Sequence, residues 1–311
     1  MNPIIKSILA PKFIFATLRV MTPILYPAIG VAVSALAGSV NIALEGIMLV
    51  SAFTGVIISA YTGSLWFALI AGVLAGVGMG AVLGYFHLNL KADIIIAAIA
   101  LNMFASGITI FLLYILTHDK GTSSSIKSLV FPSYQIPLLK DIPVLGPMLS
   151  GHNILTYLLF VAIIAFYYII YKTPLGLRIR AVGQNPEAAA SVGIDVKKIR
   201  MYSLLLSGFF GSFGGLYLSM GYVSWFSRDM TAGRGFIAIA AASLGGNLPL
   251  GTFLGAALFG LVNAFSNFIA PLKIPSEFMQ SIPYLTTVIV LAIYSINKSN
   301  KEKAALKEGA K

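Results

Sequence analysis

Apolar blocks long enough to cross a lipid bilayer recur along the whole 311-residue chain. Hydrophobic residues make up 58% of the sequence and charged residues only 10%, which excludes an ordinary soluble globular protein. A membrane β-barrel would show alternating segments of about ten residues, and these blocks do not alternate. The sequence therefore predicts an all-α, polytopic helical membrane protein, with residues 1–311 forming a single transmembrane domain.

The predicted membrane crossings number about nine, within a range of about eight to ten. They lie at residues 14–37, 44–61, 65–86, 94–116, 154–171, 202–222, 236–247, 250–270 and 281–296. Three of these segments, 44–61, 236–247 and 281–296, are short for a full crossing. We interpret them as candidates for half-helices or re-entrant segments.

The net charge of +11 comes mainly from two polar segments, the loop at 172–200 and the tail at 297–311. Basic loops of membrane proteins stay on the cytoplasmic side, so both segments are predicted to be cytoplasmic, and the charge does not indicate nucleic-acid binding. The longest loop, 117–152, is then external. Nine crossings place the N-terminus outside, although the basic residues near it oppose this, and one re-entrant segment more or fewer would reverse it.

The sequence lacks the features of several other function classes. It has no cysteine and therefore no disulfide or thiol chemistry. No segment has the phosphate-binding pattern G-x-x-x-x-G-K-[ST], so we expect that the chain does not hydrolyse ATP itself. Its histidines, His87, His118 and His152, show no metal-ligand spacing, and we expect neither a metal nor a cofactor on this chain. No cleavable signal is evident, and the first span is expected to serve as the targeting signal.

The cytoplasmic loop 172–200 contains a short helix with clear start and stop signals. Asn185 can cap the helix, Pro186 suits its first position, and Gly193 suits a left-handed end. Glu187 favours the positive end of the helix, and three alanines follow it. A helix of about two turns is marginal in water on its own. Its presence on the wet side of a membrane protein therefore indicates a partner surface.

Two polar interruptions of apolar segments, at 36–53 and 243–260, resemble each other. Each runs from small residues through a break with an asparagine into a glycine-containing apolar helix. Broken helices of internal repeats lie near the substrate path in transporters. Two such breaks can also arise by chance, so their common origin stays open.

Polar residues in or beside the predicted spans are candidates for a substrate path. Glu45, four residues after Asn41, either stabilises a helix start that Asn41 or its neighbour caps, or lines a water-filled cavity, and both can hold. Asn102 is either an interhelical hydrogen-bonding group or a polar group of the path. The same two interpretations apply to Asn247 and Asn263.

Two further patterns concern packing and an external connection. The glycines of one span recur at every fourth position, which lets helix backbones approach closely, and we interpret them as a packing face rather than a ligand site. They are Gly72, Gly76, Gly80 and Gly84. The connection 225–236 carries Arg228, Asp229 and Arg234 among small residues. It is either an ordinary external loop or a contact for a partner or the mouth of the path.

Several of these motifs together resemble a known family. The segment RAVGQNPEAAASVGID (180–195) resembles the cytoplasmic coupling loop of permease subunits from ATP-binding-cassette importers, in the branch that handles branched-chain amino acids, sugars and nucleosides. Within this branch, SVNIALEGIML (39–49), KADIIIAAIALNM (91–103) and RDMTAGRGFIAIAA (228–241) are most similar to bacterial nucleoside permeases. The resemblance extends from about residue 15 to residue 296, and the coupling loop is its most specific part.

The resemblance implies a multi-pass permease subunit of an ATP-driven nucleoside importer in a bacterial cell membrane. It implies a heterodimer with a second related permease, an extracellular substrate-binding lipoprotein, and a cytoplasmic ATPase subunit that uses ATP and Mg. The implied ATPase contact consists of Gly183, Asn185, Pro186, Glu187, Ala188, Ala189, Gly193 and Ile194.

Three alternatives remain open at this point. The same importer class also carries ribose-like sugars and branched-chain amino acids. A secondary transporter driven by an ion gradient is a second alternative, but the spans lack buried acid–base pairs. A membrane scaffold that transports nothing is the third, and the polar breaks in the helices argue against it.

Overall fold

The computed structural model describes residues 11–137, 142, 145–269, 285, 286, 288, 289 and 292. Its elements are α2 (Pro11–Leu36), α3 (Leu44–Thr62), α4 (Leu65–Gly84), the π-helical turn η1 (Tyr85–Asn89), α5 (Ile94–Thr117), β1 (Ser133–Tyr134), α7 (Leu145–Leu149), β2 (His152–Asn153), α8 (Ile154–Lys172), α9 (Pro174–Gln184), α10 (Pro186–Ser191), α11 (Val196–Tyr217), the π-helical turn η2 (Leu218–Tyr222), α12 (Arg234–Leu244) and α13 (Pro249–Ile269).

Seven helices of the described part are long and apolar enough to cross a membrane, and α12 is a shorter apolar helix. The predicted all-α, polytopic membrane architecture is thereby confirmed. The predicted segment 44–61 is not a half-helix, because α3 has 19 residues and qualifies as a full crossing. The predicted segment 236–247 corresponds to α12, which has only 11 residues. The predicted span 281–296, apart from five isolated residues, and the tail 297–311 lie outside the described residues.

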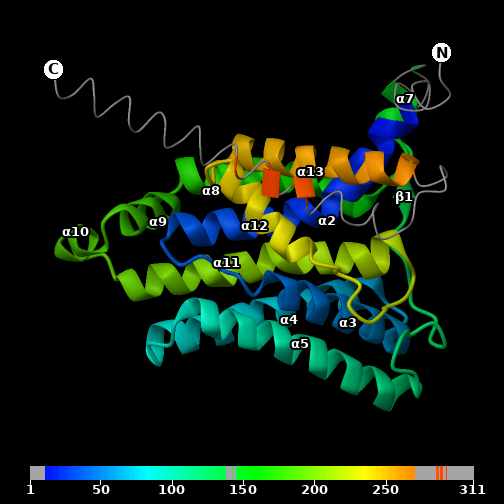
Figure 1. The fold of residues 1–311 in the computed structure, drawn as a ribbon, viewed down its shortest axis with the longest axis horizontal. Coiled ribbons are helices and arrows are strands. Elements are labelled where there is room, and N and C mark those ends of the chain that lie inside the picture. Colours follow the sequence, from blue (N-terminus) through cyan, green and yellow to red (C-terminus); the bar gives the residue numbers. More distant parts are fainter. Residues whose placement is uncertain are drawn as a thin grey trace.

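Helices α2 and α11 form the centre of the bundle (Figure 1). In their most apolar stretches 72% of the residues of α2 and 78% of those of the span formed by α11 and η2 are buried, against 28% in α5 and in α8. Helix α11 packs along α2 on one side and along α3 and α4 on the other. The outer helices therefore present most of their apolar side chains to the surroundings, as expected of helices that face lipid.

Close packing of α4 against α11 depends on glycines. The four glycines Gly72, Gly76, Gly80 and Gly84 all lie against residues of α11. A Cβ atom on Gly80 would lie 2.7 Å from the carbonyl oxygen of Leu204, and one on Gly208 would lie 2.5 Å from the carbonyl oxygen of Gly76. No side chain fits at these distances, so the two backbones touch here, as in helix pairs joined by small residues.

The two ends of the bundle carry different structures (Figure 1). Helices α9 and α10 lie at one end, and the two-stranded pair β1–β2 lies at the other. Strand β1 pairs antiparallel with β2, with Ser133 opposite Asn153. The segment before β1 is tied to the bundle, because the N–H of Leu129 donates to Ser59 Oγ at 3.1 Å and the N–H of Phe131 donates to the Met220 carbonyl at 2.8 Å.

Candidate functional site

The first predicted break, between α2 and α3, is held by Asn41. Its amide nitrogen donates to Ser207 Oγ at 3.0 Å, and its amide oxygen accepts from the N–H of Ala43 at 2.9 Å. Its own N–H donates to Ser34 Oγ at 3.0 Å, and the residue is fully buried. Ala43 occupies the N-cap position of α3. Asn41 thus fixes the unwound segment from within and is enclosed by protein.

The carboxylate of Glu45 joins α3 to the N-terminus of α12. One carboxylate oxygen accepts from the N–H of Gly233 at 2.7 Å, and the other accepts from the N–H of Gly235 at 2.7 Å. Gly233 is the N-cap residue of α12 and has φ 75°. A carboxylate at a helix N-terminus is favourable because it meets unpaired N–H groups and the positive end of the helix dipole. Glu45 therefore caps a helix distant in sequence, an arrangement that sequence reasoning did not anticipate.

Asn102 of α5 forms hydrogen bonds with the backbone at the start of α3. Its amide oxygen accepts from the N–H of Gly46 at 2.8 Å, and its amide nitrogen donates to the Ile42 carbonyl at 3.0 Å. Both ends of the amide are thus engaged by the backbone at the break between α2 and α3. This geometry corresponds to the interhelical hydrogen-bonding interpretation of Asn102.

The second predicted break, between α12 and α13, lies away from the first. Gly246 and Asn247 have φ 63° and φ 58°, and the N–H of Asn247 donates to the Ala242 carbonyl at 2.8 Å. Asn247 Oδ1 is buried and has no partner among the described residues. Helix α12 extends for about 16 Å at 1.5 Å per residue, and its far end carries this break. Asn247 is therefore not brought together with Glu45 or Asn102.

Asn263 lies beside a small polar cavity. The cavity has a volume of about 120 Å³ and is lined by Val20, Pro23, Leu218, Tyr222, Arg234, Asn263 and Asn267. The Asn263 amide nitrogen donates to the carbonyl of Phe259 on the same helix at 3.0 Å. Asn267, one turn further along α13, was not singled out from the sequence. A second amide at i+4 on the same face was the signal that could have indicated it.

A charged cluster beside the middle of α5 was predicted from the sequence only in part. The hydroxyl of Ser106 donates to Asp229 Oδ1 at 2.9 Å, and Arg228 Nε lies 3.3 Å from Asp229 Oδ2. The two charged residues belong to the connection that the sequence predicted to be an external loop. Nothing in the sequence around Ser106 indicated this contact, which joins residues 123 positions apart.

The loop 172–200 contains the helix α10, with the predicted start and stop residues. The side chain of Asn185 accepts from the N–H of Ala188 at 2.9 Å, and Pro186 begins α10. Gly193 has φ 84°, and the N–H of Ile194 donates to the Ala189 carbonyl at 3.1 Å. The next residue, Asp195, caps α11, and the Lys198 N–H that it accepts lowers the pKa of its carboxyl.

Gly183 has a different place from the rest of the predicted ATPase contact. It packs so closely on the Leu36 carbonyl at the end of α2 that no Cβ atom would fit. Close by, Arg200 Nε donates to the Ala37 carbonyl at 3.3 Å. The loop that carries α10 is therefore in direct contact with the break between α2 and α3.

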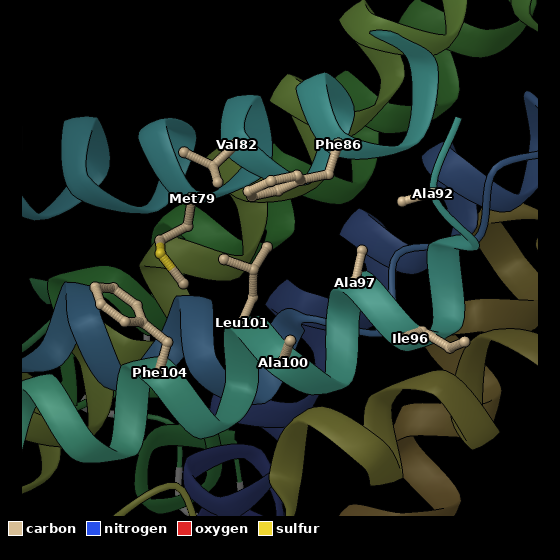
Figure 2. Close-up of a pocket in the computed structure, with 9 residues that line it drawn as sticks. All are labelled: Met79, Val82, Phe86, Ala92, Ile96, Ala97, Ala100, Leu101 and Phe104. Atoms are coloured by element: carbon tan, nitrogen blue, oxygen red, sulfur yellow. The ribbon is translucent and has the colours of Figure 1, made fainter. Parts of the chain in front are cut away.

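An apolar cavity of about 530 Å³ lies between α4 and α5. In Figure 2, Met79, Val82 and Phe86 lie opposite Leu101 and Phe104 of α5. Substrate sites combine apolar walls with a few convergent polar groups. All nine lining side chains here are apolar, so this groove is not a candidate for the recognition of a polar substrate.

Among the described residues, no group of three or more His, Asp or Glu side chains is placed to hold a metal ion. His87 Nδ1 lies 3.1 Å from the Ala92 carbonyl, and His152 Nε2 lies 3.1 Å from the Met148 carbonyl. His152 also stacks on Phe15 with ring centroids 4.0 Å apart, and burial lowers its pKa.

Spanning helices with polar breaks are typical of membrane transport proteins. The model of the family described as "Branched-chain amino acid transport system / permease component" matches residues 13–292, so the chain belongs to that family. The resemblance inferred from the sequence motifs is thereby confirmed. As a member of this family, the chain is a permease subunit rather than an enzyme.

Two curated relatives cover most of the chain. The nucleoside ABC transporter permease protein NupC of Lactococcus lactis is 35% identical over 88% of this chain and 89% of its own. The guanosine ABC transporter permease protein NupQ of Bacillus subtilis is 34% identical over 96% of this chain and 95% of its own. The structure of PsaBC from Streptococcus pneumoniae in complex with Fab covers 94% of both chains with a TM-score of 0.52 and 15% identity, which concerns the fold alone.

Proposed function

We propose that this chain is the permease subunit of an ATP-driven importer that moves nucleosides across a bacterial cell membrane. The observation that carries the proposal is the similarity, at 35% and 34% identity over nearly whole chains, to permeases named for nucleosides and for guanosine. A nucleoside is an uncharged polar molecule. Its passage needs a polar route but no buried charge of its own.

The proposed complex contains this chain, a second related permease, a cytoplasmic ATPase and an extracellular binding protein. Residues 1–311 form one transmembrane domain in this proposal, with the loop 172–200 and the C-terminal tail in the cytoplasm. The exposed helix α10 supports the ATPase contact, because its neighbour Val192 is 73% exposed and has no role in the core. The opposite end, with β1 and β2, would then face the binding protein.

The contacts of the coupling loop support a mechanical role. A displacement of α10 by the ATPase would reach α2 through Gly183 and the Ala37 carbonyl through Arg200. From there the unwound segment leads directly into α3. Glu45 on α3 holds α12, so motion of the loop and reorientation of the half-helix α12 would occur together.

The candidate polar groups of the substrate path divide into two kinds. Asn41, Glu45 and Asn102 hold the broken segments together, because their polar atoms already bond to the protein. Asn263 and Asn267, beside the small cavity, are the candidates for direct contact with the substrate.

The proposal is tested by uptake of radiolabelled uridine, guanosine, ribose and leucine in cells that lack this chain and in the same cells complemented with it. We expect complementation to restore nucleoside uptake and to leave ribose and leucine uptake unchanged. Restoration of ribose or leucine uptake instead would leave the permease function in place and contradict the nucleoside assignment.

A further inference from the structure

The Arg228–Asp229 pair lies near the middle of a membrane-spanning helix. Asp229 accepts a hydrogen bond from Ser106 of α5 at 2.9 Å. At 1.5 Å per residue, Ser106 is about 18 Å from the first residue of α5 and about 16 Å from the last. A bilayer core is about 30 Å thick, so the pair lies close to the midplane of the membrane.

The pair is also open to its surroundings. The Arg228 and Asp229 side chains are 61% and 56% exposed. Charged groups at the bilayer centre are costly when they face lipid, and they face a water-filled cavity or another protein instead. In a membrane, the face of α5 that carries Ser106 is therefore turned to water or to a neighbouring protein rather than to lipid.

The backbone that carries the pair is held in a fixed shape. The N–H of Arg228 donates to the Gly121 carbonyl at 2.8 Å, and Glu45 binds the N–H groups of Gly233 and Gly235 at the end of the segment. Asp229 has φ 51°, a left-handed conformation that few residues other than glycine adopt, although Asn and Asp do so more readily than most. Such conformations cluster at ligand-binding sites, where the surrounding structure enforces them.

The remaining hydrogen-bonding capacity of the pair has a definite pattern. A carboxylate has about four lone-pair sites. Ser106 and Arg228 Nε take one on each oxygen, so one site on each oxygen remains for a ligand. The terminal nitrogens of the Arg228 guanidinium have no partner among the described residues and supply further donors. The pair thus offers two parallel acceptors beside a cluster of donors.

We infer that Arg228 and Asp229 form a subsite that reads the base of a guanine nucleoside as it passes the midplane. This inference rests on the proposed nucleoside function. Guanine presents two adjacent donors, N1–H and the N2 amino group, which match the two free carboxylate sites. Its O6 and N7 acceptors match an arginine fork, a common specific contact of guanine in proteins. Adenine and uracil lack two adjacent donors beside a carbonyl, so they fit the pair less well.

The test uses the purified complex of both permeases, the ATPase and the binding protein in proteoliposomes. ATP-driven initial uptake of guanosine, adenosine and uridine is measured for the wild type and for Asp229→Asn. The substitution keeps an oxygen for Ser106 and a residue type that tolerates positive φ, but it replaces one acceptor with a donor. We expect the guanosine-to-uridine uptake ratio to fall about tenfold, as the loss of a bidentate contact predicts.

Two further variants sharpen the test. Asp93→Asn makes the same chemical change at the N-cap of α5, where Asn and Asp are equivalent caps, and it should leave the ratio unchanged. Arg228→Lys keeps the charge but removes the fork, and it should lower the same ratio even if Asp229→Asn fails to assemble.

An equal reduction for all three nucleosides, or no change in the ratio, would overturn the assignment of base recognition to this pair. A wild-type complex that transports a sugar or an amino acid and no nucleoside would contradict the proposed function instead. The two failures are therefore distinguishable in one set of measurements.

Discussion

At the scale of single residues, Glu45 connects parts of the chain that are 188 positions apart. Its carboxylate pairs with two N–H groups, at Gly233 and Gly235, and both hydrogen bonds are 2.7 Å long. Charge-assisted hydrogen bonds of this kind are about twice as strong as neutral ones. Gly235 leaves no room for a side chain, because a Cβ atom there would lie 2.5 Å from the Glu45 nitrogen. The contact therefore fixes the position of α12 relative to α3.

Replacement of Glu45 by glutamine should weaken this contact. The glutamine oxygen can accept from one N–H group, but its NH2 group opposes the other, which leaves a partly buried donor unpaired. We expect a loss of about 1–3 kcal/mol in the free energy of unfolding and slower uptake. Thermal unfolding of the detergent-solubilised complex measures the first effect. Asp93→Asn is the control, because an amide caps α5 as well as a carboxylate does. Equal midpoints of thermal unfolding for the two variants would contradict the stabilising role of the contact between Glu45 and the N-terminus of α12.

The position of Glu45 was predictable from the sequence, but its partner was not. A lone carboxylate at the start of an apolar segment indicates either helix-end stabilisation or a polar cavity. Its actual acceptor role depends on where α12 begins, which is decided by tertiary packing. The same holds for Ser106, an ordinary serine within a span until Asp229 is placed beside it. Contacts between residues more than a hundred positions apart produce no local sequence pattern from which they could be predicted.

At the scale of elements, regular patterns predicted more. The spacing of Gly72, Gly76, Gly80 and Gly84 indicated a packing face, and all four lie against α11. The caps of α10 were readable because capping is a local matter of a few neighbouring residues. By contrast, the predicted bounds 44–61 match α3, but its interpretation as a candidate half-helix does not hold, because the break at residues 37–43 precedes the helix and leaves it intact.

The α4–α11 contact can be tested with two substitutions on the same helix. Gly80→Ala should cost about 1–3 kcal/mol, because its Cβ would lie 2.7 Å from the Leu204 carbonyl oxygen in a packed interior. Gly78→Ala should cost nothing, because nothing lies within 4 Å of a Cβ atom at that position. Unfolding midpoints of the two variants, compared in one detergent, check this difference. A Gly78→Ala variant as unstable as Gly80→Ala would contradict the assigned packing face.

The coupling helix can be tested in a similar way. Gly193→Val forces a branched side chain into φ 84°, and Glu187→Arg reverses the charge in the first turn of α10. We expect either change to reduce ATP-driven uptake by about tenfold, within the usual range of coupling energies, while the protein still inserts into the membrane. Gly63→Val is the matched control, since Gly63 has φ 63° and open space around it at the end of α3. Equal loss in that control would indicate general misfolding rather than uncoupling.

At the scale of the whole molecule, α2 and α3 connect the loop that carries α10 to the N-terminus of α12. The coupling loop contacts the end of α2 at Leu36 and Ala37. The unwound segment that follows is held by Asn41 and leads to Glu45, which holds α12. Rigid helices joined by a fixed break can move as units, which is what alternating access requires of a transporter built from broken helices.

ATP hydrolysis by a partner subunit is proposed to drive nucleosides through this chain. The most direct measurement is uptake of radiolabelled guanosine into proteoliposomes that contain the complete complex, with and without ATP and with and without an ion gradient. We expect uptake that requires ATP and is unaffected when the gradient is dissipated. Uptake that continues without ATP and stops when the gradient is dissipated would contradict it and identify a secondary transporter.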